Sequence, residues 1–134
     1  TGVLIIGAGG HAKVVADILH AQGVHILGYL DDETSLHGQQ RLGLPVLGLV
    51  DNSFNSKGLI IGIGSNSARR AIAKRLSDAP DNQWINAIHP QAIVAPSVQF
   101  GVGVAVAAGA VINPDTVIGD HAIINTGATV DHDC

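Results

Sequence analysis

The sequence is poor in aromatic residues, in charge and in cysteine, and each shortage narrows the possible classes of protein. Aromatic residues make up 3% of the 134 residues and hydrophobic residues 46%, so a core must be built from Val, Ile, Leu and Ala. The formal net charge of −4 provides no basic field for nucleic acid and no attraction to an anionic membrane. The single cysteine excludes an internal disulfide and makes the cytoplasm the default location.

Long apolar runs are also missing. The run Val3–Ile6 is too short for a signal sequence or a membrane span, so we expect no membrane partner. The first residue is Thr1 and not Met, which leaves open whether residues precede it. Glycine, by contrast, is plentiful, and its 17 copies suit tight turns and corners.

The last third of the chain carries a repeat of six residues. From residue 88 onward a large apolar residue recurs at every sixth position, and a small residue follows four places after each one. The large residues are Ile88, Val94, Phe100, Val106, Ile112, Ile118, Ile124 and Val130, and the small ones are Ala92, Val98, Val104, Ala110, Thr116, Ala122, Ala128 and Cys134. This period fits neither a helix nor an ordinary strand. It is typical of a parallel β-helix, in which the large residue points to the axis and the small one lies at a corner.

Three hexads form one coil of a triangular solenoid, which predicts coils at residues 88–105 and 106–123 and part of a third at 124–134. The chain ends inside a coil, and no capping repeat is visible to cover the exposed backbone groups there. Three interpretations stay open: the solenoid continues in a longer protein, the end is an artificial boundary, or a partner covers it.

The first part of the chain predicts a small parallel sheet. Val3–Ile6 and Val24–Leu30 are expected as strands on either side of a helix over Ala12–His20, which makes a βαβ unit. Residues 33–45 are expected to be irregular, before a short strand that starts near Pro45. We therefore predict a Rossmann-like domain over residues 1–84 and a partial β-helix over residues 85–134.

The loop after the first strand predicts a nucleotide site. Gly7, Gly9 and Ala12 have the G-x-G-x-x-G/A spacing, and Asp31 and Asp32 follow the second strand, where a ribose hydroxyl would lie. Glycines let backbone N–H groups approach a phosphate, and the following helix N-terminus favours its charge. The alternative is that the glycines only turn the chain and that the aspartates are loop or capping residues.

Two further polar residues are expected at the same edge of the sheet. His11 lies in the loop where its side chain can reach a phosphate or a sugar, although a solvated loop histidine is the alternative. Asn66 follows the predicted strand Gly58–Ile63, and ligands of parallel sheets collect at the carboxyl ends of strands. Its alternative role is a helix N-cap.

Five motifs together resemble a known family over the whole chain. They are Gly7-Ala-Gly-Gly-His-Ala-Lys13, Leu30-Asp-Asp32, Ile61-Gly-Ile-Gly-Ser-Asn66 with Arg69, Ile88-His-Pro90, and Ile124-Asn-Thr-Gly-Ala-Thr-Val-Asp-His-Asp133. This combination resembles the sialic-acid O-acetyltransferase and nucleotide-amino-sugar N-acetyltransferase family, which consists of left-handed β-helix hexapeptide-repeat acyltransferases. The resemblance implies a homotrimer that uses acetyl-CoA and holds a sugar or sugar nucleotide in its α/β domain.

The resemblance also implies roles for particular residues. The family histidine that matches His132 is the general base, the acidic residue that matches Asp133 supports it, and Asn125 matches a polar position near the reacting groups. The region that holds the nucleotide sugar is matched by Gly9, Gly10, His11, Asp31 and Asp32. The family's further coils, which carry much of the acetyl-CoA contact, are absent after Cys134, so no residue of this chain is assigned to acetyl-CoA.

The chemistry of the last corner supports the same roles independently. Acetyl transfer needs a base with a pKa near the working pH, and a carboxylate on the other ring nitrogen fixes the tautomer of a histidine. His132 and Asp133 supply both groups, but neighbours in a strand point to opposite faces, so the chain must bend between them. The alternative for His132 is a corner histidine that only faces solvent.

We therefore expect an acetyl-CoA-dependent acetyltransferase that acts on an amino sugar, a nucleotide-linked amino sugar or sialic acid, with N- or O-acetylation left open. One rival is a nucleotide- or NAD-binding protein whose solenoid only forms trimers, and another is a catalytically incomplete sugar-nucleotide scaffold. We expect no metal, since the spacing of His121, Asp131, His132, Asp133 and Cys134 matches no common metal motif. His121 is expected to face solvent at its corner, and Cys134 to be a packing residue, with a Cys–His acyl-enzyme as a minor alternative.

Overall fold

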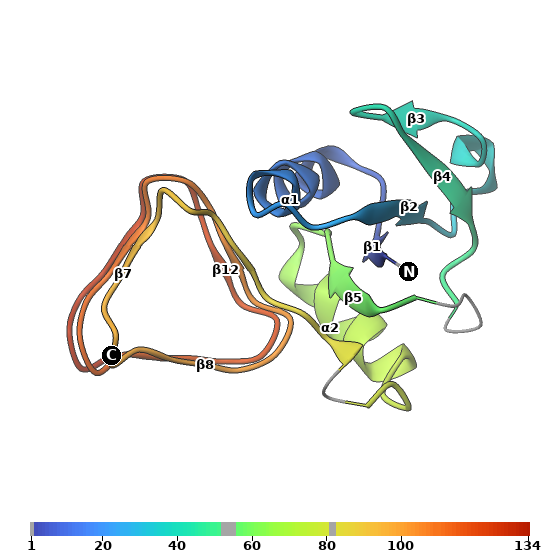
Figure 1. Ribbon diagram of the computed structural model, residues 1–134. Coiled ribbons are helices and arrows are strands. Elements are labelled where there is room, and N and C mark those ends of the chain that lie inside the picture. The colour runs from blue at the N-terminus through green and yellow to red at the C-terminus, as the bar shows by residue number, and fades with distance from the viewer. Residues whose placement is uncertain (1, 52–55, 81–82) are drawn as a thin grey trace.

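The computed structural model describes residues 2–51, 56–80 and 83–134, and it contains a small α/β unit followed by a triangular solenoid (Figure 1). The α/β unit has five strands in the order β3-β4-β2-β1-β5. They are β1 (Val3–Ile6), β2 (Ile26–Leu30), β3 (Gln40–Arg41), β4 (Leu44–Gly48) and β5 (Gly58–Ile61). All pairs are parallel except β3 with β4, and every residue of β1 and β5 is buried. Burial on both faces explains why these strands are continuous apolar runs in the sequence.

Each face of the sheet has its own core. Val3 and Ile5 of β1 pack in the cluster that includes helix α1 (Gly10–Ala21). Leu4 and Ile6 point to the other face, where Leu76, just after helix α2 (Asn66–Arg75), joins the cluster. In the described parts of the chain, no helix combines the length and apolarity that a membrane span requires.

The region expected to be irregular proved partly regular. Residues 33–45 contain a short 3₁₀ helix, η1 (Thr34–Leu36), and strand β3, which forms a hairpin with β4. The two turn residues Leu42 and Gly43 both have positive φ, 51° and 76°, as a type I′ hairpin turn requires. The two-residue strand is too short to produce a periodic pattern, so sequence periodicity could not detect it.

Helix α1 begins directly after the glycine-rich loop and lies close to β5. An added Cβ on Gly62 would be 2.9 Å from the Cα of Ala12, and Ala12 is fully buried. Small residues are therefore needed at both positions, because the helix approaches the end of β5 closely. This contact explains the small residue at the last position of the glycine-rich motif.

Strands that are 18 residues apart pair in the solenoid, as predicted. The strands are β6 (Ala87–Ile88), β7 (Ile93–Val94), β8 (Gln99–Phe100), β9 (Ala105–Val106), β10 (Val111–Ile112), β11 (Val117–Ile118), β12 (Ile123–Ile124) and β13 (Thr129–Val130). They form three parallel ladders, β6–β9–β12, β7–β10–β13 and β8–β11, one on each side of the triangle (Figure 1). All eight large residues of the hexads belong to one core cluster, which confirms the predicted inward positions.

The corners turn through residues with left-handed backbone geometry. From residue 103 onward every sixth residue has φ between 56° and 73°, and these residues are Gly103, Gly109, Asp115, His121, Gly127 and Asp133. Glycine accepts this geometry without strain, whereas Asp and His adopt it at some cost. The corners therefore place particular polar side chains, His121 and Asp133 among them, on sharp bends.

One side of the solenoid packs against the α/β unit. Ala87 and Ala105, which lie on β6 and β9, belong with Ala107 to the cluster around α1, and all three are buried. Helix α1 contacts β6 directly. Figure 1 shows this side of the triangle turned toward α1 and α2. Small outward side chains thus let the helix approach the coils.

Replacing Gly103 by Ala should destabilise the protein. An added Cβ would overlap the imidazole of His121, and the φ of 71° would strain an alanine. Strain alone costs about 1–2 kcal/mol, so we expect the free energy of unfolding in urea to fall by at least that amount. The control is Gly119→Ala in the same solenoid, where nothing lies within 4 Å of the added Cβ. Equal stability of the two variants would contradict this account.

Candidate functional site

A crevice lies at the carboxyl ends of β1, β2 and β5, where the sequence predicted a ligand site. Its volume is about 280 Å³. It is lined by Gly7, Asp31, Asp32, Val50, Ile63, Ala68, Ala71 and Ile72. The lining comes from segments far apart in the sequence, which the parallel sheet brings to one edge.

The N-terminus of α1 is open beside this crevice. Gly9 and Gly10 are exposed, and nothing lies within 4 Å of a Cβ added to either. Gly9 is the N-cap and has no side chain to satisfy the first N–H groups, and the first turn contains no acidic residue. Free N–H groups at a helix N-terminus favour an anion.

His11, in the first turn of α1, is half-buried next to Arg69. Its Nε2 atom is buried and has no hydrogen-bond partner among the described residues. Burial, followed by the positive charge of Arg69, lowers the pKa of His11 below its ordinary value of 6.5. A neutral imidazole has one donor and one acceptor nitrogen, and since Nε2 is covered by protein, a hydrogen bond to a ligand would use Nδ1.

Asp31 and Asp32 both hold loops in this structure. Asp31 accepts hydrogen bonds from the backbone N–H groups of Ala8 (2.9 Å) and Glu33 (2.8 Å). Asp32 pairs with Arg75 and accepts the N–H of Val50 at 3.1 Å. The hydrogen bond from Arg75 is the main reason why the pKa of Asp32 lies below its ordinary value. These contacts agree with the alternative role as loop residues, and contact of either carboxylate with a ribose stays a prediction.

Asn66 begins α2 and does not cap it. The N-cap is Ser65, whose Oγ accepts the N–H of Ala68 at 3.3 Å. The capping interpretation of Asn66 is therefore wrong. Its Oδ1 instead accepts a hydrogen bond from Arg69 Nη2, and its side chain lines a second pocket of about 230 Å³ with Arg69, Arg70, Ala73, Asp120 and His121.

His132 and Asp133 form a hydrogen-bonded pair on a solenoid corner. Nδ1 of His132 lies 2.7 Å from Asp133 Oδ2, and the φ of 56° at Asp133 supplies the bend that adjacent residues need to face each other. Asp131 Oδ1 accepts the backbone N–H of His132 and lies 4.0 Å from its Nε2. The His132 side chain is 70% exposed, so Nε2 is accessible from solvent.

The structure does not bring all the predicted site residues together. Asn125 follows β12 and His132 follows β13, so they lie on different corners. The corner of His132 joins the β7–β10–β13 side to the β8–β11 side, since Cys134 O accepts the N–H of Val117. Figure 1 shows this corner, marked by the C-terminus, away from the α/β unit. Within one chain, the histidine and the crevice are therefore apart.

His121 occupies a corner next to α2 and is half-buried, so the expectation that it faces solvent is wrong. Its ring meets Trp84 edge-on with centroids 4.7 Å apart, and its Nδ1 has no partner among the described residues. Burial lowers the pKa of His121, Asp120 partly offsets this, and Arg69 lowers it further. No local sequence pattern indicates this contact, because Trp84 belongs to the segment before the first coil.

The metal ligand set considered from the sequence is wrong, because His121 and residues 131–134 lie on different corners. Across residues 2–51, 56–80 and 83–134, no group of three His, Cys, Asp or Glu side chains could hold a metal ion. Cys134 is exposed, so its expected packing role is not seen.

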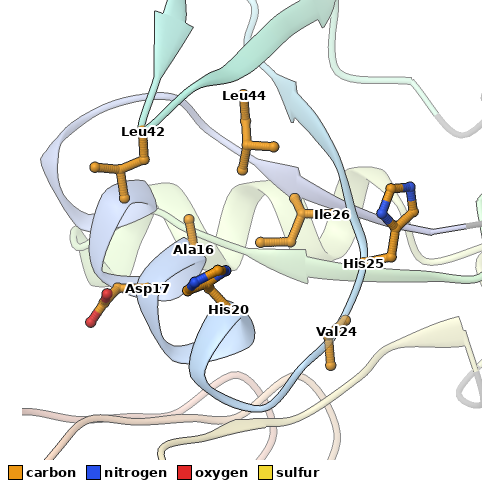
Figure 2. Close-up of a pocket in the computed structure, with 8 residues that line it drawn as sticks. All are labelled: Ala16, Asp17, His20, Val24, His25, Ile26, Leu42 and Leu44. Atoms are coloured by element: carbon orange, nitrogen blue, oxygen red, sulfur yellow. The ribbon is translucent and has the colours of Figure 1, made fainter.

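A larger pocket lies at the opposite edge of the sheet. It measures about 520 Å³ and is lined by Ala16, Asp17, His20, Val24, His25, Ile26, Leu42 and Leu44. Figure 2 shows Leu42 and Leu44 from the β3–β4 hairpin above Ala16 of α1 and Ile26 of β2. We place the candidate site at the smaller crevice, because open helix N–H groups and polar side chains meet there.

Acidification should destabilise the fold through His11 and His121. In the unfolded chain these imidazoles take up protons near pH 6.5, whereas in the folded protein their lowered pKa values delay protonation. The unfolded state therefore binds more protons below about pH 6.5, and the free energy of unfolding falls as the pH drops. Urea denaturation at about pH 7.5 and 5.5 would show a smaller fall for His121→Gln than for wild type. The exposed His20→Gln serves as control, and an unchanged fall in His121→Gln would contradict this assignment.

Comparison with known proteins agrees with this architecture. Residues 2–76 match the PglD N-terminal domain family. The chain is 37% identical over 111 residues to the UDP-N-acetylbacillosamine N-acetyltransferase of Bacillus subtilis, which covers 79% of this chain and 51% of that protein. PerB from Caulobacter crescentus, solved with CoA and GDP-perosamine, has a TM-score of 0.87 and 44% identity, over 100% of this chain and 64% of PerB.

The acetyltransferase domain of PglB from Neisseria gonorrhoeae, solved with acetyl coenzyme A, also has a TM-score of 0.87, with 39% identity. That match covers 98% of this chain and 65% of the PglB domain. The chain thus spans less than two thirds of each of these relatives. Because the PglD match covers more than half of the chain, the chain belongs to the PglD N-terminal domain family, and the predicted resemblance to nucleotide-amino-sugar N-acetyltransferases is confirmed.

Proposed function

We propose that the polypeptide containing this chain transfers an acetyl group from acetyl-CoA to the amino group of a nucleotide-linked amino sugar. The observation that carries this proposal is the His132–Asp133 pair, whose Nδ1–Oδ2 distance is 2.7 Å. N-acetylation is favoured over O-acetylation because the Bacillus relative is an N-acetyltransferase and PerB was solved with CoA and GDP-perosamine. We place the reaction in the cytoplasm, as the single cysteine favours.

His132 acts as the general base. When Nδ1–H of His132 donates a hydrogen bond to the Asp133 carboxylate, the lone pair of Nε2 is free to take a proton from the acceptor amine as the amine nitrogen attacks the thioester carbonyl. The C–S bond then breaks, and the imidazolium returns that proton to the departing thiolate of CoA. Asp133 stabilises the imidazolium between these two steps.

The crevice holds the sugar nucleotide. The open N–H groups at the start of α1, next to Gly9 and Gly10, receive its diphosphate, and the neutral His11 supplies a further hydrogen bond. Asp31, Asp32 and Asn66 lie at the same edge and contact the nucleoside or the sugar. We assign this function to a Rossmann-like domain of residues 1–84.

The active site is completed by a homotrimer of left-handed β-helices, each beginning at residue 85 of its chain. The two sides of the solenoid that α1 leaves uncovered expose Ile93 and Val117, which are 67% and 63% accessible. Such apolar side chains on an outer face favour burial against another subunit. Packing of the solenoids brings His132 and Asn125 of different subunits close to a crevice and forms the acetyl-CoA cleft between coils.

Replacing His132 by Ala should nearly abolish acetyl transfer. Loss of a general base costs on the order of 10²–10⁴-fold in rate, measured as release of the CoA thiol with acetyl-CoA and a UDP- or GDP-linked amino sugar. The control His20→Ala changes an exposed histidine on α1 that lines the pocket at the opposite edge of the sheet. An unchanged rate in His132→Ala would refute the assigned base. Thermal stabilisation by NAD alone would instead support a dinucleotide-binding protein.

Replacing Gly10 by Asp should block the sugar nucleotide. The added carboxylate has room in the open crevice and would place a negative charge where the diphosphate binds. The matched control is Gly10→Asn, which has the same shape without the charge. Calorimetric titration should show affinity for the sugar nucleotide at least about tenfold weaker in Gly10→Asp than in Gly10→Asn. Equal affinities would mean that the diphosphate does not bind at this helix N-terminus.

A further inference from the structure

The geometry at the start of α2 points to Arg69 as a positioning residue for acetyl transfer. Its guanidinium joins the loop between β5 and α2, at the crevice, to the solenoid corner at His121. The inference rests on the proposed function, because it concerns the distance between an acceptor bound in the crevice and a base on the solenoid.

The guanidinium of Arg69 is almost saturated by hydrogen bonds. Nη1 donates to the carbonyl oxygens of Ile63 (3.3 Å) and Gly64 (2.8 Å), and Nη2 donates to Asn66 Oδ1. Nε donates across the junction to the carbonyl of His121 at 3.1 Å. An arginine has five N–H donors, so these four bonds leave little capacity to bind a phosphate. The side chain therefore connects protein segments.

Only arginine can make this set of contacts. Its donors lie in one rigid plane and diverge, so one side chain can reach acceptors on two segments at once. Lysine has the same charge, but its donors share a single nitrogen and cannot span the Gly64 and His121 carbonyls in the same way. An Arg69→Lys variant thus removes the connection and keeps the charge.

The rest of the junction is mostly apolar. On one flank, α1 packs against the small side chains of Ala87, Ala105 and Ala107. On the other flank, Trp84 is 8% exposed, packs in the same cluster as Val102 and meets the His121 ring edge-on. Apolar contacts of this kind are strong but non-directional. The backbone hydrogen bond from Ile85 N–H to the Leu59 carbonyl (2.9 Å) is directional, but it lies at the covalent link between the two parts. The hydrogen bond from Arg69 Nε to the His121 carbonyl lies away from that link and therefore restrains the tilt of the crevice relative to the coils.

Acetyl transfer depends on that tilt. The acceptor nitrogen must come within about 3–3.5 Å of the thioester carbon, and an error of about 1 Å can cost on the order of 10²-fold in rate. A small rotation at the junction leaves the crevice intact but moves a bound sugar relative to the base. Arg69 should therefore affect kcat far more than the affinity for the sugar nucleotide.

The test compares Arg69→Lys with the matched control Arg70→Lys. Arg70 is the next residue, and its exposed side chain makes no hydrogen bond with the described residues. Trp84 is the single tryptophan of the chain, so its emission reports on the junction without any assay of activity. We expect Arg69→Lys to shift this emission and to speed amide hydrogen exchange at residues 119–123, with neither change in Arg70→Lys.

Kinetics then test the positioning role on the same proteins. We expect kcat of Arg69→Lys to fall at least about tenfold. The lost bonds to Gly64 and Asn66 at the crevice can weaken binding, so the criterion is a fall in kcat larger than any rise in the calorimetric Kd for the sugar nucleotide. Arg69→Gln, which keeps a planar N–H donor group but loses the charge and the other donors, is measured alongside in case the lysine variant does not unfold cooperatively in urea.

Three results would overturn the inference, and each is distinct. Unchanged Trp84 emission and exchange in Arg69→Lys would show that Arg69 does not fix the junction. A changed junction with an unchanged kcat would show that its position does not control transfer. A wild-type protein that binds sugar nucleotide but never releases CoA would refute the proposed function itself, and the positioning role with it.

Discussion

Pairing between residues that are 18 positions apart is the constraint on which the rest of the structure depends. It fixes which residue occupies each corner, so that His121 faces α2 and His132 lies on the corner opposite the α/β unit. It also stacks Ala87 and Ala105 on one outer side, where α1 can approach closely. Moving the hexads by one residue would turn the inward side chains outward, so this arrangement of corners and sides is strongly specified.

The elements that could be predicted from the sequence are those whose burial produces a regular pattern of apolar residues. Val3–Ile6 is buried on both faces, and each hexad carries its own large apolar residue for the axis, so both patterns are visible without tertiary information. Strand β3 was missed because it has two residues, too few for a periodic pattern, and is defined by its pairing with β4. Tyr29 Oη donates to the carbonyl of Arg41, and the N–H of Val46 bonds to Gln39, contacts that use backbone groups which every residue possesses.

The candidate site likewise contains contacts that the sequence could predict and contacts that it could not. His132 and Asp133 are neighbours in the sequence, and the bend between them follows from the hexad register, so their hydrogen bond could be anticipated. The Arg69–His121 contact could not, because the residues are 52 positions apart and the acceptor is a carbonyl group. The roles of Asp31 and Asp32 were ambiguous for a different reason. A carboxylate after a strand can hold either a loop or a ligand, and here both bind backbone N–H groups.

On the proposed function, one chain binds the acceptor at the crevice of its α/β unit and carries the general base on the solenoid corner farthest from that unit. The distance between a bound acceptor and the base then depends on two interfaces. One lies within the chain, at α1 and Arg69, and the other lies between solenoids. A solenoid core packed with aliphatic side chains is stiff, because close-packed interiors do not deform continuously. Errors in the active-site distance therefore arise mainly at the two interfaces. This explains why Arg69, with its four hydrogen bonds at the intrachain junction, matters to the proposed chemistry although it contacts no reacting atom.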